Sequence, residues 1–241
     1  MEISIYKDYH ELSLQAADRI IKQVEQKPDA VLCLAAGDTP RLTYDTIADR
    51  MVKENLDFGQ CTFVGLDEWV DIPPGNEGSC HYFLQKHLFD PLRISPDQVH
   101  LFDALSSDLN HECRKMNDLI STLDGIDLML VGIGMNGHIG FNEPGVSPDL
   151  YAHVVDLDEA TRTVGQKYFR QQTALAQGIT LGLNHLLEAR KVILIANGAK
   201  KAGVIKQAVE GPVTPELPAT IIRMHANSEM MLEEEAAGRK R

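Results

Sequence analysis

Hydrophobic residues gather along the chain in short runs, and longer segments with mixed apolar and polar positions separate these runs. Several runs are apolar at four to six consecutive positions, which is typical of central strands in a sheet covered on both faces. We predict strands at residues 2–6, 30–37, 61–69, 98–102, 126–134, 152–157, 191–198 and 219–225. We predict helices at residues 8–25, 39–54, 79–88, 107–122, 159–174 and 199–210. This alternation favours an α/β fold with a mostly parallel sheet and helices on both of its faces.

The length and composition of the chain fit one folded unit. Its 241 residues, 44% hydrophobic and 24% charged, contain no repeat, low-complexity segment or linker, so we predict a single domain over residues 1–241. Residues 229–241 are expected to form a charged helix end or tail. No apolar run approaches the roughly 20 residues that span a bilayer, and the first residues lack the apolar core of a signal peptide. We therefore expect a cytoplasmic protein without a membrane segment.

The charge and the cysteines argue against several kinds of partner. A net charge of −12 disfavours a nucleic-acid-binding surface, although a few local cations suffice to hold a small anion. The four cysteines are scattered without the spacing that marks a zinc site, and Cys33 and Cys61 lie in apolar runs and are expected in the core. The sequence therefore predicts neither a nucleic-acid partner nor a bound metal.

Two strand ends carry residues suited to an anion, and ligands of parallel sheets bind beyond the carboxyl ends of the strands. In "LAAGDTPRLTY", Gly37 and Thr39 open a helix whose free N–H groups can cradle a phosphate, with Thr39 as the expected cap. Asp38 would repel that phosphate unless it turns away. Lys201 opens another helix in "IANGAKK", and Lys167 in "TRTVGQKYF" is a second candidate cation. A plain strand–helix junction and solvated lysines explain these residues equally well.

Two further strand ends carry groups suited to proton transfer. Asp67 follows the apolar run of "TFVGLDEW" and can act as a base if partial burial raises its pKa. In "VGIGMNGHIGFNEPG", glycines permit a tight loop with His138 at its tip, and Glu143 can stabilise the charged imidazole and orient its ring. A solvated strand end explains Asp67 as well, whereas the density of polar groups around His138 favours a functional loop.

Together these segments resemble the glucosamine-6-phosphate deaminase/isomerase family, which includes galactosamine-6-phosphate relatives. The resemblance spans nearly the whole chain, through "VLCLAAGDTPRLTY", "FVGLDEWV", "GIGMNGHIGFNEPG", "ITLGL" and "AVEGPVTPELPAT". It implies a three-layer, modified Rossmann-like fold and an enzyme that needs no metal or cofactor. The implied reaction converts glucosamine 6-phosphate to fructose 6-phosphate and ammonia in amino-sugar catabolism. The "LDEWVD" and "LTY" sequences are closer to members that act on galactosamine 6-phosphate, which would give tagatose 6-phosphate.

The resemblance also implies a role for each site residue. His138, supported by Glu143, would assist opening of the sugar ring, and Asp67 would move a proton from C2 to C1. Asn136 completes the implied catalytic group. The residues implied to bind the phosphate are Gly37, Asp38, Thr39, Lys167 and Lys201.

Three positions depart from the family pattern. Asn136 stands where many members carry an Asp, and an amide hydrogen-bonds but does not exchange a proton at neutral pH. Lys167 replaces an Arg, which keeps the charge but loses the bidentate contact. Asp38 replaces a small residue, usually Ser. The Arg-rich segment of the deaminases and the extra length of the allosteric members are missing, so no allosteric regulation is expected.

Two rival functions stay open at the level of the sequence. A 6-phosphogluconolactonase has a loop like "GHIG", but is expected to carry "GDER" where this chain has "GLDEW" and to lack "FNEPG". A sugar-phosphate-sensing module is expected to carry a helix-turn-helix extension and to lack the catalytic groups. The expected partner is in each case a small sugar phosphate, and the pattern leaves a monomer and a homo-oligomer open.

Overall fold

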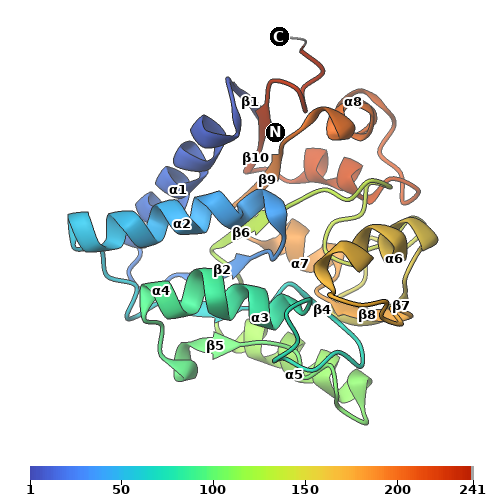
Figure 1. The fold of residues 1–241 in the computed structure, drawn as a ribbon, viewed down its shortest axis with the longest axis horizontal. Coiled ribbons are helices and arrows are strands. Elements are labelled where there is room, and N and C mark those ends of the chain that lie inside the picture. Colours follow the sequence, from blue (N-terminus) through green and yellow to red (C-terminus); the bar gives the residue numbers. More distant parts are fainter. Residues whose placement is uncertain (240–241) are drawn as a thin grey trace.

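A seven-stranded sheet forms the centre of the computed structural model, which describes residues 1–239 (Figure 1). Its strands, in spatial order, are β1 (Glu2–Tyr6), β10 (Ser228–Glu233), β9 (Val192–Ala196), β6 (Leu128–Val131), β2 (Val31–Leu34), β3 (Thr62–Val64) and β5 (Val99–His100). Every neighbouring pair is parallel, so the carboxyl ends of all these strands lie at one edge. The predicted parallel sheet is confirmed.

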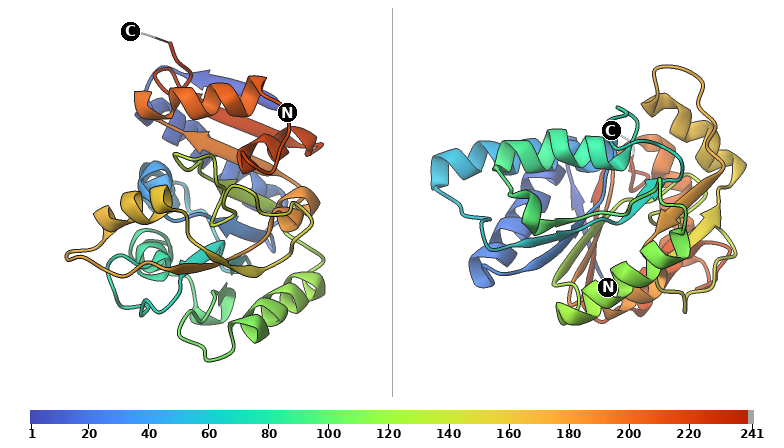
Figure 2. Two further views of the ribbon diagram at one scale, coloured as in Figure 1. Left: turned by 90° about the vertical axis from the view of Figure 1, so that its right-hand side faces the viewer. Right: turned by 90° about the horizontal axis from the view of Figure 1, so that it is seen from below.

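Helices cover both faces of this sheet, as the sequence predicts (Figure 2). One face packs against α1 (Tyr9–Gln26), α2 (Asp38–Glu54), α3 (Cys80–Leu84), the π-helical turn Gln85–Phe89 and α4 (Asp90–Leu92). The other face packs against α5 (Leu109–Thr122), α7 (Leu183–Glu188) and α8 (Ala202–Glu210). Short 3-10 segments lie at Pro96–Gln98, Gln166–Tyr168, Ala199–Lys201 and Pro218–Met224. Within residues 1–239, no helix has both the length and the apolar character needed to cross a membrane.

The two faces explain why the strands are apolar at consecutive positions. In β6, Leu128 and Leu130 pack under α1 and α2, whereas Met129 and Val131 point to the opposite core. Successive side chains of a strand point to opposite faces, so a sheet covered twice requires an apolar residue at each position. Cys33 and Cys61 are buried in these two cores, as expected.

A second, three-stranded antiparallel sheet stands beside the carboxyl edge of the first. It consists of β4 (Asp67–Trp69), β8 (Gln177–Thr180) and β7 (His153–Asp156), and α6 (Glu159–Gly165) follows β7. The single strand predicted over residues 61–69 is therefore divided, because β3 stays in the main sheet and β4 leaves it to pair with β8. This division carries Asp67 away from the main sheet and toward the space above it.

Several other predicted elements are wrong. The strand predicted at residues 219–225 is absent, because Pro218–Met224 is a 3-10 segment; β8 and α7 were not predicted. The predicted tail begins with β10, an internal strand whose core positions Met230 and Leu232 are buried and whose Glu229 is neutralised by Arg19 at 3.2 Å. Residues 240–241 of that tail lie outside the described residues. The helix predicted over residues 159–174 ends at Gly165, which lies so close to the Trp69 ring that a Cβ atom would come within 2.6 Å.

The order of the strands creates a crevice between β2 and β6. From β2 the chain moves through β3 to β5 at one edge of the sheet, and from β6 it moves through β9 and β10 toward the other edge. The loops after β2 and β6 therefore diverge at the carboxyl edge. Such a reversal of strand order is where open α/β sheets bind their ligands.

Candidate active site

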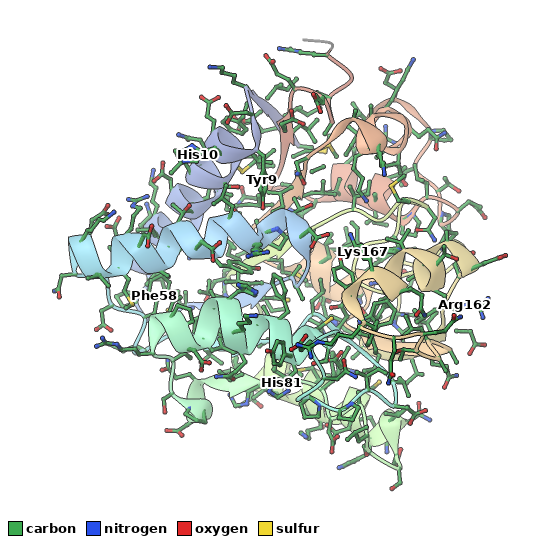
Figure 3. The ribbon with its side chains drawn as sticks, viewed as in Figure 1. Tyr9, His10, Phe58, His81, Arg162 and Lys167 are labelled. Carbon is green, nitrogen blue, oxygen red and sulfur yellow. The ribbon has the colours of Figure 1, made fainter. Side chains whose placement is uncertain are left out.

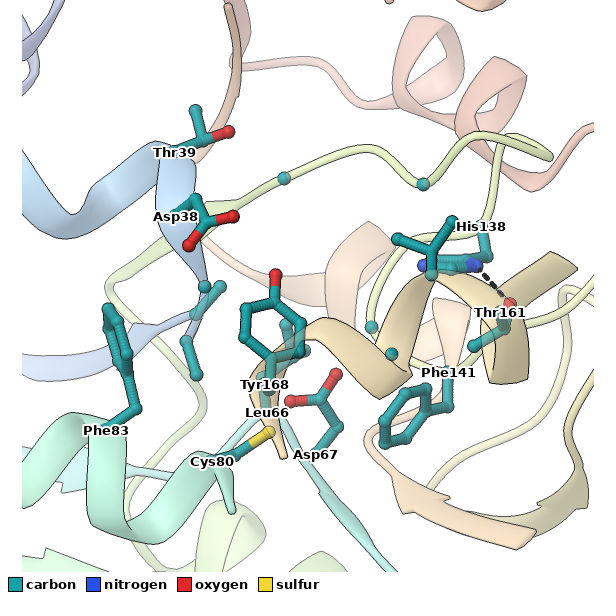
Figure 4. Close-up of a pocket in the computed structure, with 18 of the residues that line it drawn as sticks. Asp38, Thr39, Leu66, Asp67, Cys80, Phe83, His138, Phe141, Thr161 and Tyr168 are labelled. Atoms are coloured by element: carbon teal, nitrogen blue, oxygen red, sulfur yellow. Dashed lines mark hydrogen bonds between the residues drawn. The ribbon is translucent and has the colours of Figure 1, made fainter. Parts of the chain in front are cut away.

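A pocket occupies this crevice, and α6 with the segment after it closes its far side (Figure 4). Its walls come from the loops after β2, β3, β6 and β9, from the start of α3, and from residues 160–168. Eight of the nine residues predicted for the site line it, namely Gly37, Asp38, Thr39, Asp67, Asn136, His138, Lys167 and Lys201. Glu143, the ninth, lies behind the pocket wall in contact with His138.

The first turn of α2 forms one end of the pocket. Gly37 precedes the helix with a φ of 120°, a backbone conformation that favours glycine. The helix begins at Asp38 without a side-chain cap, so the prediction that Thr39 is the cap is wrong; Thr39 Oγ1 instead donates to Asn197 Oδ1 at 2.8 Å. The Tyr9 hydroxyl lies 2.8 Å from the carbonyl oxygen of Asp38 and braces this turn. The positive end of the helix dipole therefore lies at the pocket wall.

Two lysines approach this end from different elements. Lys167, in the 3-10 turn after α6, lies between α6 and α2, and its Nζ is 2.6 Å from Asp38 Oδ2 (Figure 3). Lys201 comes from the segment after β9 and donates to the carbonyl oxygen of Ile133 at 2.5 Å. Burial, and then the charge of Lys167, lower the pKa of Lys201 to about 8. Lys201 is thus still mostly charged at neutral pH, and it makes this end of the pocket suited to an anion.

Asp67 begins β4 and lies on the floor of the pocket beside Cys80 (Figure 4). Burial, and then the negative charge of Glu68, raise the pKa of Asp67 to about 7. The neighbouring Cys80 thiol favours the charged carboxylate and opposes this rise. A carboxyl group with such a pKa can take up and release a proton near neutral pH.

Glu68, the adjacent carboxylate, is held away from the pocket. It is buried and accepts hydrogen bonds from the backbone N–H groups of Trp69 at 2.8 Å, Cys80 at 3.0 Å and His81 at 2.8 Å. It therefore links β4 to the start of α3, and Asp67 is the carboxylate of this pair that faces the pocket. Trp69 is a packing residue, and its ring centroid lies 4.5 Å from that of Phe141.

A polar cluster surrounds His138 on the opposite side of the pocket. The Thr161 hydroxyl lies 2.9 Å from His138 Nδ1, and Glu143 Oε2 lies 3.5 Å from the same nitrogen. Asn136 donates to Glu143 Oε2 at 2.8 Å and accepts from the backbone N–H of His138 at 3.3 Å. Burial acts to raise the pKa of Glu143, but its contacts with His138, Thr161 and Asn136 outweigh burial and hold the pKa below its ordinary value. The cluster thus fixes the imidazole with its other edge toward the pocket (Figure 4).

Gly134 is the glycine in the His138 loop whose missing side chain matters most for the position of the imidazole. A Cβ atom there would lie 2.4 Å from the imidazole of His138, so only glycine leaves space for the ring. The loop "GIGMNGHIG" therefore needs glycine at this position to bring His138 over the pocket.

The sequence did not indicate Thr161 or Cys80. Thr161 lies 23 residues from His138 in the middle of a helical pattern, where a threonine carries no signal. Cys80 was counted only as a scattered cysteine. The described part of the chain, residues 1–239, contains no group of three or more His, Cys, Asp or Glu side chains that could hold a metal ion. The arrangement offers an end suited to an anion, a carboxyl group whose pKa is raised to about 7 and a fixed imidazole across the pocket from it.

Comparison with known proteins places this fold and site in one family. The family model described as glucosamine-6-phosphate isomerases/6-phosphogluconolactonase matches residues 7–232, and the chain belongs to this family. A glucosamine-6-phosphate deaminase from Thermoanaerobacter pseudethanolicus is 36% identical over 238 residues, which cover 98% of this chain and 94% of that protein. A solved monomeric glucosamine-6-phosphate deaminase is 33% identical, with full coverage of both chains and a TM-score of 0.96. The 6-phosphogluconolactonase of Trypanosoma brucei shares the fold, at 21% identity, 98% and 97% coverage and a TM-score of 0.79.

Proposed function

We propose that this protein is a hexosamine-6-phosphate deaminase that converts glucosamine 6-phosphate to fructose 6-phosphate and ammonia. The observation that carries the proposal is the placement of Asp67 and His138 across one pocket from each other, with Lys167 and Lys201 at its end. The 36% identity to a deaminase over 98% of the chain supports the same activity. The protein's expected location is the cytoplasm, where a phosphorylated sugar would be retained.

Ring opening is the first step of the proposed reaction. His138 transfers a proton between the anomeric hydroxyl and the ring oxygen, so that the pyranose opens to an aldehyde with the amino group at C2. Thr161 and Glu143 hold the imidazole of His138 by its Nδ1 atom, which leaves Nε2 for the sugar. Asn136 fixes Glu143 but exchanges no proton itself.

Asp67 is the base of the second step. It removes the proton from C2 to give an enolamine and returns it at C1, which leaves an imine at C2. Water then adds to the imine carbon, and ammonia departs to leave the ketose. The pKa of about 7 suits this cycle, because the carboxyl must be a base in one half and an acid in the other. Each step moves only protons, water and ammonia, so no cofactor is required.

The phosphate of the substrate occupies the end of the pocket formed by Gly37, Asp38 and Thr39. Backbone N–H groups at the start of α2 and the positive helix dipole favour an anion there. Lys201 and Lys167 supply the charges on the two sides. This placement would anchor the sugar at C6 and leave C1 and C2 for the catalytic groups.

Galactosamine 6-phosphate, with tagatose 6-phosphate as the product, is the second candidate substrate. The "LDEWVD" and "LTY" sequences favour it, since they resemble members that act on that sugar. The two substrates differ only in the configuration at C4, which takes no part in the proton transfers.

An ammonia-release assay on both hexosamine 6-phosphates, run in parallel with the hydrolysis of 6-phosphogluconolactone, tests the proposal. We expect ammonia and a ketose 6-phosphate in equal amounts from at least one hexosamine. Lactone hydrolysis without ammonia would overturn the proposal, and so would tight binding of a hexosamine 6-phosphate without turnover.

A further inference from the structure

A carboxylate lies in the part of the pocket proposed to bind phosphate. Asp38 is the first residue of α2, and its Oδ2 atom is 2.6 Å from Lys167 Nζ. Within residues 1–239, Lys167 is the only hydrogen-bond partner of this carboxylate. One of the two cations available to a ligand is therefore already paired with a group of the protein itself.

The two lysines of the pocket differ in this respect. Lys201 is partly buried and donates to the carbonyl oxygen of Ile133, and no carboxylate among residues 1–239 forms an ion pair with it. The pair of Lys167 and Asp38 is open to solvent, since the two side chains are 48% and 68% exposed. An exposed ion pair of this kind is held weakly and exchanges partners readily.

We propose that Asp38 sets the affinity of the pocket for phosphate by competing with it for Lys167. The proposal rests on the phosphate position given above. A phosphate monoester carries nearly two negative charges at pH 7, so it repels a carboxylate that stays beside it. To reach Lys167 the phosphate must displace Asp38, whose side chain is free to rotate into solvent. Lys201 contributes to binding throughout, whereas Lys167 contributes only after this exchange.

The Asp38→Asn variant tests the competition, because it removes the charge and keeps the shape of the side chain. We expect the KM for the hexosamine 6-phosphate to fall about tenfold and kcat to stay the same. Inorganic phosphate should bind about tenfold more tightly by isothermal titration calorimetry. Asp49→Asn is the matched control, because it removes the same charge from an exposed site on the same helix, outside the pocket. An unchanged or raised KM and phosphate Kd in Asp38→Asn, or an equal gain in Asp49→Asn, would overturn the proposal.

A double-mutant cycle shows whether Asp38 acts through Lys167. In the Lys167→Met background, Asp38→Asn should improve phosphate binding clearly less than it does in the native chain. An equal improvement would mean that the carboxylate only repels the ligand, which contradicts competition for Lys167. The calorimetric measurement requires no turnover, so an absence of deaminase activity would count against the proposed function and leave the test of Asp38 intact. A native chain that fails to bind inorganic phosphate, together with an Asp38→Asn variant that also fails, would overturn the competition.

Discussion

Asp67 is partly buried and Asp127 is fully buried, and the two aspartates lie near opposite edges of the seven-stranded sheet. Their surroundings differ sharply. Asp127 precedes β6 at the amino edge, is 2% exposed, and accepts hydrogen bonds from Lys27 Nζ at 2.7 Å, Arg190 at 3.0 Å and the backbone N–H of Val31 at 2.7 Å. Asp67, at the carboxyl edge, has Glu68 and a thiol as its neighbours, and no cation is paired with it among residues 1–239. One carboxylate is paired with two cations, and the other lies beside a pocket without a paired cation.

This difference separates the residues that hold the sheet together from those that act at its edge. The contacts of Asp127 join the start of β6 to the start of β2 and to the segment before β9, and both of its carboxylate oxygens accept hydrogen bonds from the protein. Burial and the negative charge of Glu68 destabilise the charged form of Asp67. Its carboxyl group therefore binds and releases a proton near neutral pH. The same residue type thus holds strands together at Asp127 and, in the function proposed above, supplies the base at Asp67 in opposite electrostatic surroundings.

The largest effect is expected for Asp67→Asn. An amide cannot take the proton from C2, so kcat for ammonia release should fall roughly 10³-fold or more. The substrate should still bind, because the phosphate end of the pocket is untouched. A steady-state assay gives kcat, and calorimetry with the acyclic alditol 6-phosphate of the substrate gives affinity without turnover. Loss of affinity with kcat preserved would contradict the role of Asp67 as the base.

Asp127→Asn is expected to act on stability alone. The substitution leaves Lys27 and Arg190 beside a neutral amide that cannot neutralise either charge. We expect the free energy of unfolding to fall by about 2–3 kcal/mol. This loss is smaller than for a fully buried ion pair, because both cations reach solvent. Urea denaturation measures the change, and kcat/KM of the folded enzyme should stay within twofold of the native value, roughly the scatter of such assays. Asp124→Asn is the control: it also pairs with Arg190 but is 92% exposed, so it should cost less than about 1 kcal/mol. Equal losses in the two variants would remove the contrast between the sheet edges.

The sequence predicts the buried strands and the glycine-rich strand ends of this molecule better than its individual side-chain contacts. Strands such as β6 are recognisable because both faces need apolar residues, and glycine-rich strand ends mark the pocket. β10 was missed because its glutamates suggest a solvated tail. In the fold, Glu229 pairs with Arg19, 210 residues away, and Glu233 accepts a hydrogen bond from the backbone N–H of Gly198, so both carboxylates can be buried in a strand. Thr161 and Cys80 could not be predicted for the same reason, since their roles depend on which distant residue the fold places beside them.

The pH dependence of the reaction involves the smallest expected effect and is the most specific test of the difference between Asp67 and Asp127. Asp67 must be ionised to accept the proton from C2, and its pKa of about 7 means that it becomes protonated as the pH falls through neutrality. We therefore expect kcat/KM to rise with pH up to about 7 and to fall about tenfold per unit well below it. Cys80→Ala removes a thiol that favours the charged form of Asp67, so this acid limb should move to higher pH, whereas Asp127→Asn should leave it in place. An acid limb near pH 4, where an ordinary aspartate titrates, would mean that the surroundings of Asp67 do not raise its pKa, and the electrostatic distinction between the two edges would then fail.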